Sequence, residues 1–155
     1  MGAYTKLKFI YPFTGGVVMP DETLVKGFYF MVKINKNDIL SYKIINLRYR
    51  KTDDYSKGGF YMIKHIKSGK SYIGKSIDYM ARLKQHTYIS NKQTTIDVAL
   101  KGNLNEFEFY LIFDYKVFNI DYFNRKLETI IEQKLIQEYK TYTPNGFNVR
   151  YYGHI

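Results

Sequence analysis

The order of apolar and polar positions predicts a series of short antiparallel strands from about residue 59 onward. Phe60 to Ile66 is a run of apolar and β-branched residues typical of a strand. A polar turn at 68–70 follows it, and 71–74 then predicts a short returning strand. Apolar and polar residues alternate over 106–115, which predicts a strand with one buried face. These strands are close enough in the sequence to form one small, mainly antiparallel sheet.

Helical spacing of apolar residues predicts three helices around these strands. Asp78 is a suitable N-cap for a helix that reaches about Ile89, and a short helix opened by Thr95 and Asp97 would end at Gly102. A longer helix is predicted over 121–139, with a buried stripe formed by Phe123, Leu127, Ile130, Ile131 and Leu135. A turn at 144–146 and a last strand at 147–151 complete the pattern. The fold class expected is α+β, a small sheet flanked by helices.

The first third of the chain has a different pattern, which predicts a β-hairpin extension. Strands are expected at 24–34 and 39–49, joined by turn residues at 35–38. A polar stretch closed by two glycines then suggests a boundary between 1–58 and 59–155. The second strand carries Arg48 and Arg50. Two interpretations stay open for this extension: a solvated strand face, or a ribbon that contacts phosphates or a second subunit.

Composition narrows the partners of this chain. Its 155 residues suit one domain. It has 24 basic and 14 acidic residues, and a net charge of +10 points to a polyanion, either nucleic acid or an acidic membrane surface. The absence of cysteine excludes disulfide scaffolds, zinc fingers and thiol catalysis. The sequence shows no targeting segment and no apolar run of membrane-spanning length, so we expect a cytoplasmic protein with no membrane partner.

Groups that could hydrolyse a phosphodiester cluster in one segment. That reaction needs a base for the attacking water and positive charge near the scissile phosphate. Arg82 and His86 are four residues apart and therefore share a helix face, shortly after the strand that contains Tyr72. Arg82 stays charged at any working pH, and its planar fork matches phosphate oxygens. A basic helix face alone is usually just solvated, so this cluster needs further support.

That support comes from a set of motifs in a fixed order. The set runs Gly59-Phe60-Tyr61, Tyr72-Ile73-Gly74, Arg82 with His86, Glu132, and Gly146-Phe147-Asn148. It resembles the GIY-YIG nuclease family over about 90 residues, with Phe60 where the family name has Ile. Because the chain contains 17 tyrosines, a single matching tyrosine carries little weight. The joint order and the strand-turn-strand-helix context carry the resemblance.

The resemblance implies a magnesium-dependent endonuclease that cuts double-stranded DNA. It implies that Tyr61 deprotonates the attacking water, which requires nearby cations to lower the pKa of its phenol from about 10. It implies that Tyr72 hydrogen-bonds into the phosphate or water network and that Arg82 neutralises charge in the transition state. His86 either relays the proton of Tyr61 or simply completes a surface helix.

The resemblance also implies a metal ligand at Glu132. A single carboxylate suits Mg²⁺, with Mn²⁺ as a substitute, but not a two-metal site. Glu128, one turn earlier, is the rival, although its distance to Gly146 fits the family pattern less well. Asn148 is expected to steady the site without contacting the reacting atoms.

Two lysines belong to the candidate site, and one residue that several family members have is missing from it. Lys75 and Lys84 are candidate phosphate contacts beside the motifs. Several family members have a His or Tyr near the start of the second helix, whereas the stretch 91–95 offers only Gln93. If that position matters for proton transfer, this chain depends on His86 or Tyr61 alone.

The biological role expected is site-specific restriction. The extra residues precede the catalytic module, as in the compact restriction enzymes of the family, and seven residues follow it. Cutting both strands needs two active sites, so we expect a homodimer at least on DNA. The alternatives are a free-standing phage or mobile-element nuclease, a non-catalytic nucleic-acid-binding module that keeps the fold, and a basic structural protein whose tyrosines are all core.

Overall fold

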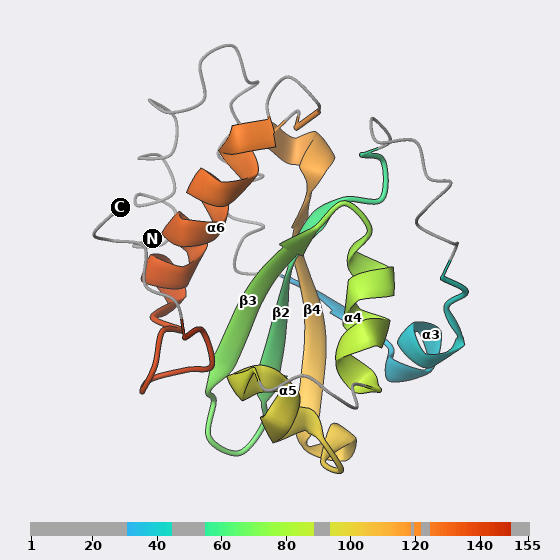
Figure 1. The fold of residues 1–155 in the computed structure, drawn as a ribbon, viewed down its shortest axis with the longest axis vertical. Coiled ribbons are helices and arrows are strands. Elements are labelled where there is room, and N and C mark those ends of the chain that lie inside the picture. The colour runs from blue at the N-terminus through green and yellow to red at the C-terminus, as the bar shows by residue number, and fades with distance from the viewer. Residues whose placement is uncertain (1–30, 45–54, 89–93, 119, 122–124, 150–155) are drawn as a thin grey trace.

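The centre of the molecule is a four-stranded antiparallel sheet. The computed structural model describes residues 31–44, 55–88, 94–118, 120–121 and 125–149 (Figure 1). The strands are β1 (Val32–Ile34), β2 (Gly59–His65), β3 (Ser71–Ser76) and β4 (Phe107–Asp114). Their order across the sheet is β1-β4-β2-β3, and every neighbouring pair is antiparallel. The α+β class and the mainly antiparallel sheet are confirmed.

Helices cover both faces of this sheet. The helix α6 (Arg125–Tyr139) lies on one side of β3 and α4 (Tyr79–Thr87) on the other, as Figure 1 shows. Two short helices, α3 (Lys36–Ser41) and α5 (Thr95–Leu100), pack against α4. Single 3₁₀ turns, η3 (Leu104–Glu106) and η4 (Tyr115–Phe118), flank β4. Among the described helices, none is long and apolar enough to cross a membrane.

Alternation along the strands gives the sheet a separate core on each face. Phe60, Met62 and Ile73 pack with the buried residues of α6. Tyr61 and Ile63 point the other way and pack with buried residues of α4 and α5. Successive strand residues face opposite sides of a sheet, so the motif Gly59-Phe60-Tyr61 divides its two aromatic rings between the two cores.

The pairing of β2 with β4 is irregular at the position that leads into Tyr61. Phe60 pairs with Phe113 but Tyr61 pairs with Leu111, so one extra residue, Ile112, lies on β4. Such a bulge bends the strand and increases its local twist. It therefore bends β4 directly opposite the first tyrosine of the motif.

Most of the elements predicted for residues 59–139 are confirmed. β2, β4 and the turn between β2 and β3 lie where expected, and β3 extends two residues further than predicted, to Ser76. Asp78 is the N-cap of α4, where its Oδ1 accepts the N–H of Ala81 at 3.1 Å. Gly102 has a φ of +76° after α5, the left-handed conformation expected of a helix-ending glycine.

The predicted N-terminal hairpin is wrong in its described second half. Residues 36–41 form α3 where a turn and a strand were expected. The physical reason is Asn35, whose Oδ1 accepts the N–H of Asn37 at 2.8 Å and so caps a helix instead of forming a hairpin turn. The strand β1 does form, and it pairs with β4 of the central sheet. Arg48 and Arg50 lie outside the described residues, and the domain division at residue 58 stays a prediction.

Two boundaries in the C-terminal half also differ from the prediction. The helix α6 begins at Arg125, and Asp121, the predicted start, is not helical. Residues 147–149 do not form a strand, although Asn148 makes an isolated bridge with Tyr142. The side chain of Asn148, described below, takes the place of the expected strand pairing.

Candidate active site

Tyr61 lies directly across the backbone of Gly74. The two residues are partners in the pairing of β2 with β3. A Cβ atom built on Gly74 would be 2.4 Å from both Cζ and the hydroxyl oxygen of Tyr61. No side chain fits in that space, so the glycine of the second tripeptide is needed for the buried position of the Tyr61 ring.

The hydroxyl of Tyr61 reaches the imidazole of His86 on α4. The oxygen lies 2.9 Å from Nε2, and His86 is 2% exposed. The ring of Tyr72 stands edge-on to this imidazole, with ring centroids 5.5 Å apart, and its centroid is 6.3 Å from that of Tyr61. The structure therefore brings three of the predicted site residues into one aromatic cluster between the sheet and α4.

A carboxylate completes this cluster on the far side of His86. Oδ1 of Asp97, on α5, lies 2.6 Å from Nδ1 of the imidazole. The other oxygen of Asp97 accepts a hydrogen bond from the hydroxyl of Thr94. From the sequence, Asp97 is predicted only as a helix-opening residue, so its contact with His86 is new. The signal was a carboxylate three residues before Leu100, on the same face of a short apolar helix.

The hydrogen bonds of Asp97 fix the proton positions in the cluster. Burial by itself would raise the pKa of this carboxyl, but the hydrogen bonds from His86 and Thr94 outweigh burial and lower the pKa. Asp97 is therefore an ionised acceptor near neutral pH, and Nδ1 of His86 carries the proton that it accepts. In neutral His86 this leaves the lone pair on Nε2 to accept the hydroxyl proton of Tyr61.

The protein groups around Tyr61 favour its neutral phenol. Burial first, and then Tyr72, raise its pKa well above 10; Arg82 lowers it, but by less. Desolvation of the charged form outweighs the charge of Arg82, so the cations of the chain by themselves do not lower the pKa of Tyr61. A pKa lowered with the help of a bound metal ion stays a prediction. Tyr61 is a neutral phenol that donates to His86.

Arg82 supplies the positive charge of the site. It lies one turn before His86 on α4 and is half-buried. Its guanidinium donates to Oε1 of Gln85 at 3.3 Å, and no carboxylate among the described residues forms an ion pair with it. Because no described carboxylate neutralises it, this guanidinium is available for an anionic ligand.

The two glutamates of α6 have different surroundings. Glu128 is buried, accepts a hydrogen bond from the hydroxyl of Tyr115, and lies 3.5 Å from Nζ of Lys75. Glu132, one turn later, receives a hydrogen bond from no residue in the described part of the chain. Burial raises its pKa to about 7, and Lys75 opposes this effect. Glu128 is therefore occupied by internal partners, whereas the carboxylate of Glu132 is left to bind something else.

These surroundings fit one divalent cation. A desolvated carboxylate without a partner is costly, and a hard cation such as Mg²⁺ would remove that cost while keeping several of its own waters. Within the described residues, no group of three or more His, Cys, Asp or Glu side chains could form a fuller cage. The donor set therefore matches the single-ligand arrangement and not a two-metal centre.

Asn148 holds the outer edge of β3 in place. Its side-chain nitrogen donates to the carbonyl of Ile73 at 2.9 Å, and its Oδ1 accepts the N–H of the same residue, also at 2.9 Å. Oδ1 also accepts the hydroxyl of Thr141 at 2.7 Å. This amide acts as a short substitute strand, and Ile73 lies between Tyr72 and Gly74. Asn148 thus supports the site without touching its polar groups.

Comparison with known protein families shows which family this arrangement belongs to. The family model of the GIY-YIG catalytic domain matches residues 57–148, more than half of the chain. The chain belongs to the GIY-YIG family. It is therefore a nuclease that acts on DNA, which makes it a hydrolase. No curated protein and no solved structure matched the chain in the searches. The match extends from just before β2 to Asn148 and so includes every residue of the cluster above.

The lysines predicted as phosphate contacts of this GIY-YIG nuclease have internal partners. Lys75 lies beside Glu128, and Lys84 donates to the carbonyl of Tyr42 at 2.7 Å, which ties the end of α3 to α4. An ammonium group has three donors, so each lysine keeps further donors for a phosphate. Gln93 lies outside the described residues.

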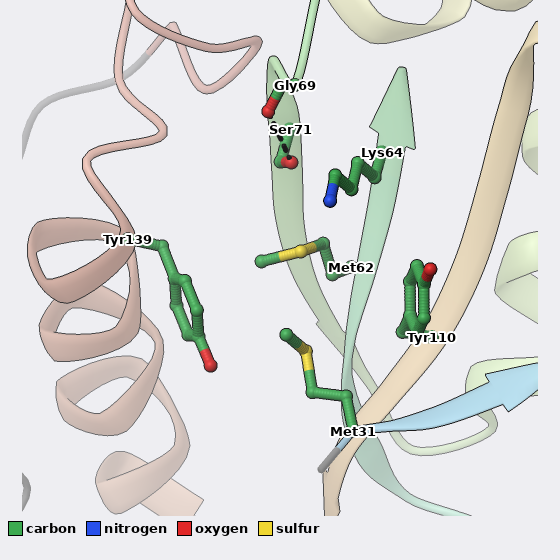
Figure 2. Close-up of a pocket in the computed structure, with 7 residues that line it drawn as sticks. All are labelled: Met31, Met62, Lys64, Gly69, Ser71, Tyr110 and Tyr139. Atoms are coloured by element: carbon green, nitrogen blue, oxygen red, sulfur yellow. Dashed lines mark hydrogen bonds between the residues drawn. The ribbon is translucent and has the colours of Figure 1, made fainter. Parts of the chain in front are cut away.

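A cavity beside α6 is separate from this chemistry. A cavity of about 300 Å³ lies between α6 and the opposite face of the sheet (Figure 2). It is lined by Met31, Met62, Lys64, Gly69, Ser71, Tyr110 and Tyr139. None of the candidate catalytic residues of the GIY-YIG cluster lines it.

Proposed function

We propose that this nuclease is a Mg²⁺-dependent endonuclease that hydrolyses phosphodiester bonds of double-stranded DNA in the manner of a restriction enzyme. The observation that carries the proposal is the buried hydrogen bond between Tyr61 and His86, with the charges of Arg82 and Glu132 both acting on the same phenol. A proton acceptor, a cation and a free carboxylate are what hydrolysis of a phosphodiester requires.

In this proposal Tyr61 and His86 activate the attacking water. The phenol oxygen takes a proton from water while its own proton passes to Nε2 of His86, so a free phenolate is never required. This accounts for a catalytic tyrosine whose pKa is raised instead of lowered. Tyr72, whose ring packs against both residues, closes the cluster and directs its hydroxyl toward the water and phosphate network.

Arg82 and Glu132 act on the phosphate from the two sides of β3. Arg82 contacts the non-bridging oxygens and stabilises the charge that develops on them. Glu132 would hold Mg²⁺, or Mn²⁺ in its place, and the ion would supply Lewis-acid stabilisation of the same charge. Lys75 and Lys84 position neighbouring phosphates, and Asn148 keeps β3 fixed between the two helices.

The restriction role adds a requirement for two sites. One catalytic cluster per chain cuts one strand, so a homodimer on DNA would produce a double-strand break. The net charge of +10 favours the long polyanionic surface of a duplex as substrate. We expect sedimentation of the protein with a cleavable duplex to show two chains per DNA; one chain per DNA during double-strand cutting would contradict the dimer.

A plasmid cleavage assay tests the reaction with matched variants. The wild type should linearise supercoiled plasmid into discrete fragments with Mg²⁺ and lose this activity with a chelator. Tyr61→Phe and Glu132→Gln should each cut about 10²–10⁴-fold more slowly. Tyr110→Phe and Glu108→Gln make the same chemical changes at a hydrogen-bonded pair on β4 and should cut within about twofold of wild type.

Each contrary result removes a defined part of the proposal. Full activity of Glu132→Gln would remove the metal assignment. A smear of products would contradict the restriction role. A wild type that binds duplex DNA but does not cut it with any divalent metal would point to a binding module instead.

A further inference from the structure

We infer that Asp97 is a positioning residue of the catalytic cluster, which holds His86 in the one tautomer and orientation that can take a proton from Tyr61. The inference rests on the proposed function, since it concerns the proton path of the same reaction. Asp97 does not touch substrate; it acts through the imidazole.

Hydrogen bonds connect Tyr61, His86, Asp97 and Thr94 in series. Tyr61 lies 2.9 Å from Nε2 and Asp97 lies 2.6 Å from Nδ1 of the same ring. The side chains of His86 and Asp97 are each 1% exposed, so water does not compete for these bonds. Thr94 holds the second oxygen of Asp97, which prevents the carboxylate from rotating away.

This arrangement fixes which atom donates and which accepts in each of these hydrogen bonds. The ionised carboxylate can only accept, so Nδ1 is the protonated nitrogen and Nε2 is the base. The carboxylate stabilises the tautomer that carries its proton on Nδ1. In the opposite tautomer Nε2–H would point at the phenol, and His86 could not accept its proton.

Every proton that moves in this step has a donor and an acceptor. The attacking water gives one proton to the oxygen of Tyr61 as the proton of Tyr61 moves to Nε2 of His86. The bond from the water oxygen to phosphorus forms, the bond from phosphorus to the leaving oxygen breaks, and the leaving oxygen takes a proton from solvent. His86 is then an imidazolium paired with Asp97, and it returns its extra proton through Tyr61 to solvent. The Nδ1 proton stays with His86 throughout.

A variant at a second aspartate can distinguish a positioning role of Asp97 from a purely structural one. Asp97 is the third residue of the six-residue helix α5, and Asp38 is the third residue of the six-residue helix α3. Both aspartates are in a first turn, where a negative charge stabilises the helix. Asp38 is exposed whereas Asp97 is buried against His86. Asp38→Asn therefore reproduces the loss of charge without the loss of the imidazole contact.

Nitrogen NMR of the histidines tests the tautomer directly. The chain has three histidines, and His86→Gln assigns the signals of His86. We expect the wild type and Asp38→Asn to show His86 protonated at Nδ1. Asp97→Asn, whose amide can donate to Nδ1, should shift His86 to the Nε2-protonated form. An unchanged Nδ1–H tautomer in folded Asp97→Asn would overturn the inference.

Kinetics test the consequence. With Mg²⁺, Asp97→Asn should lower the single-turnover cleavage rate by about 10²–10⁴-fold while the Kd for duplex DNA stays within about threefold. Asp38→Asn should cut at the wild-type rate. In a His86→Gln background, Asp97→Asn should cost no further activity, because it acts only through the missing ring. An undiminished rate for Asp97→Asn, or an equal loss in both backgrounds, would overturn the inference.

The two readouts separate this inference from the proposed function. A wild type that cuts nothing refutes the proposed reaction, while the tautomer shift in Asp97→Asn would still support the positioning of His86. If Asp97→Asn does not fold, Thr94→Val removes the bond to the far oxygen and leaves Nδ1 untouched. It should lower the cleavage rate about three- to tenfold; an unchanged rate with an unchanged NMR spectrum would overturn the inference.

Discussion

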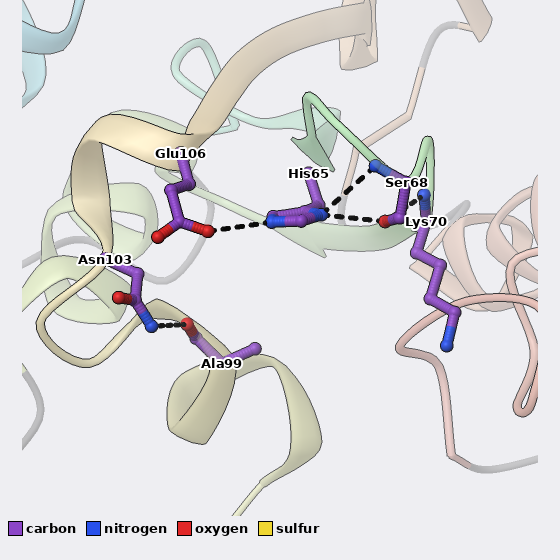
Figure 3. A network of polar contacts seen from close by, with 6 residues as sticks. All are labelled: His65, Ser68, Lys70, Ala99, Asn103 and Glu106. Atoms are coloured by element: carbon purple, nitrogen blue, oxygen red, sulfur yellow. Dashed lines mark hydrogen bonds and ion pairs between the residues drawn. The ribbon is translucent and has the colours of Figure 1, made fainter.

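Two histidines of this molecule have the same kinds of partners and very different surroundings. His86 has a tyrosine hydroxyl on one ring nitrogen and a carboxylate on the other. His65, at the end of β2, has the hydroxyl of Ser68 at 2.7 Å from Nδ1 and Oε1 of Glu106 at 3.0 Å from Nε2 (Figure 3). A search for hydroxyl–imidazole–carboxylate chains would find both.

Burial and neighbouring residues distinguish the hydrogen bonds of His86 from those of His65. The side chains of His65 and Glu106 are 21% and 52% exposed, so water competes with their contact and the pair contributes little energy. Ser68 is three residues from His65, and its hydroxyl accepts the N–H of Lys70, so this chain closes the turn between β2 and β3. The hydrogen bonds of His86 join three separate elements, β2, α4 and α5, and the imidazole and its carboxylate partner are buried. The same kinds of hydrogen bond therefore close a turn at His65, whereas at His86 they join separate elements at the candidate active site.

The largest expected difference comes from removing each imidazole. His86→Gln should slow DNA cleavage about 10²–10⁴-fold, since it deletes the acceptor for the proton of Tyr61. His65→Gln should cut within about twofold of wild type, because its ring only closes a turn. Single-turnover cleavage of one labelled duplex measures both. Similar losses of cleavage rate in the two variants would contradict different roles for the two histidines.

Two glycine variants apply the same comparison to the backbone. Gly74→Ala places a methyl group 2.4 Å from the hydroxyl of Tyr61, which must move away from His86. We expect cleavage to fall about 10²-fold and unfolding to become easier by about 1–3 kcal/mol. Gly69→Ala, in the turn beside His65, meets no atom but has a φ of +76°. It should cost about 1 kcal/mol of stability and leave cleavage unchanged. Urea unfolding and cleavage rates measure both; a fully active Gly74→Ala would contradict the close packing.

The pH dependence of stability should reveal the buried carboxylate. The folded-state pKa of Asp97 is lowered, so its contribution to stability is complete above the unfolded value of about 3.9 and is lost as pH falls through the folded value. Thermal melts from about pH 5 to pH 2 should therefore fall less steeply for Asp97→Asn than for the wild type. Parallel curves would show that Asp97 has the same pKa in both states.

The smallest effect is expected for the exposed carboxylate. Glu106→Gln removes the charge beside His65 and should change the free energy of unfolding by less than about 1 kcal/mol. Cleavage should not change. A cost of several kcal/mol in urea unfolding would mean that the exposed chain is as tightly coupled as the buried one.

Local signals made much of this fold predictable from the sequence. Asp78 caps α4 through a bond to a residue three positions away, and Gly102 ends α5 through its own backbone conformation. The joint order of the motifs from Gly59 to Asn148, in their strand-turn-strand-helix context, indicates the family. Asn35 was misread because the same side chain favours hairpin turns and helix N-caps, and the packing of the following helix decides between them.

The contacts that complete the site could not be predicted in this way. Asp97 meets His86 across eleven positions of sequence. The family pattern instead places a His or Tyr near Gln93, which does not point to Asp97. The raised pKa of Tyr61 depends on how the sheet and α4 enclose it, which no local pattern encodes. The tie between Asn148 and Ile73 spans 75 positions.

The amide of Asn148 also bears on how two copies can meet. An edge strand with free backbone groups is a template on which another chain can pair. On β3 the carbonyl of Ser71 accepts the N–H of Phe147, and both backbone groups of Ile73 are bound by Asn148. A second molecule cannot extend the sheet past these positions. A homodimer that cuts both strands would therefore join through other surfaces, and the two active sites beside β3 would stay apart, one for each DNA strand.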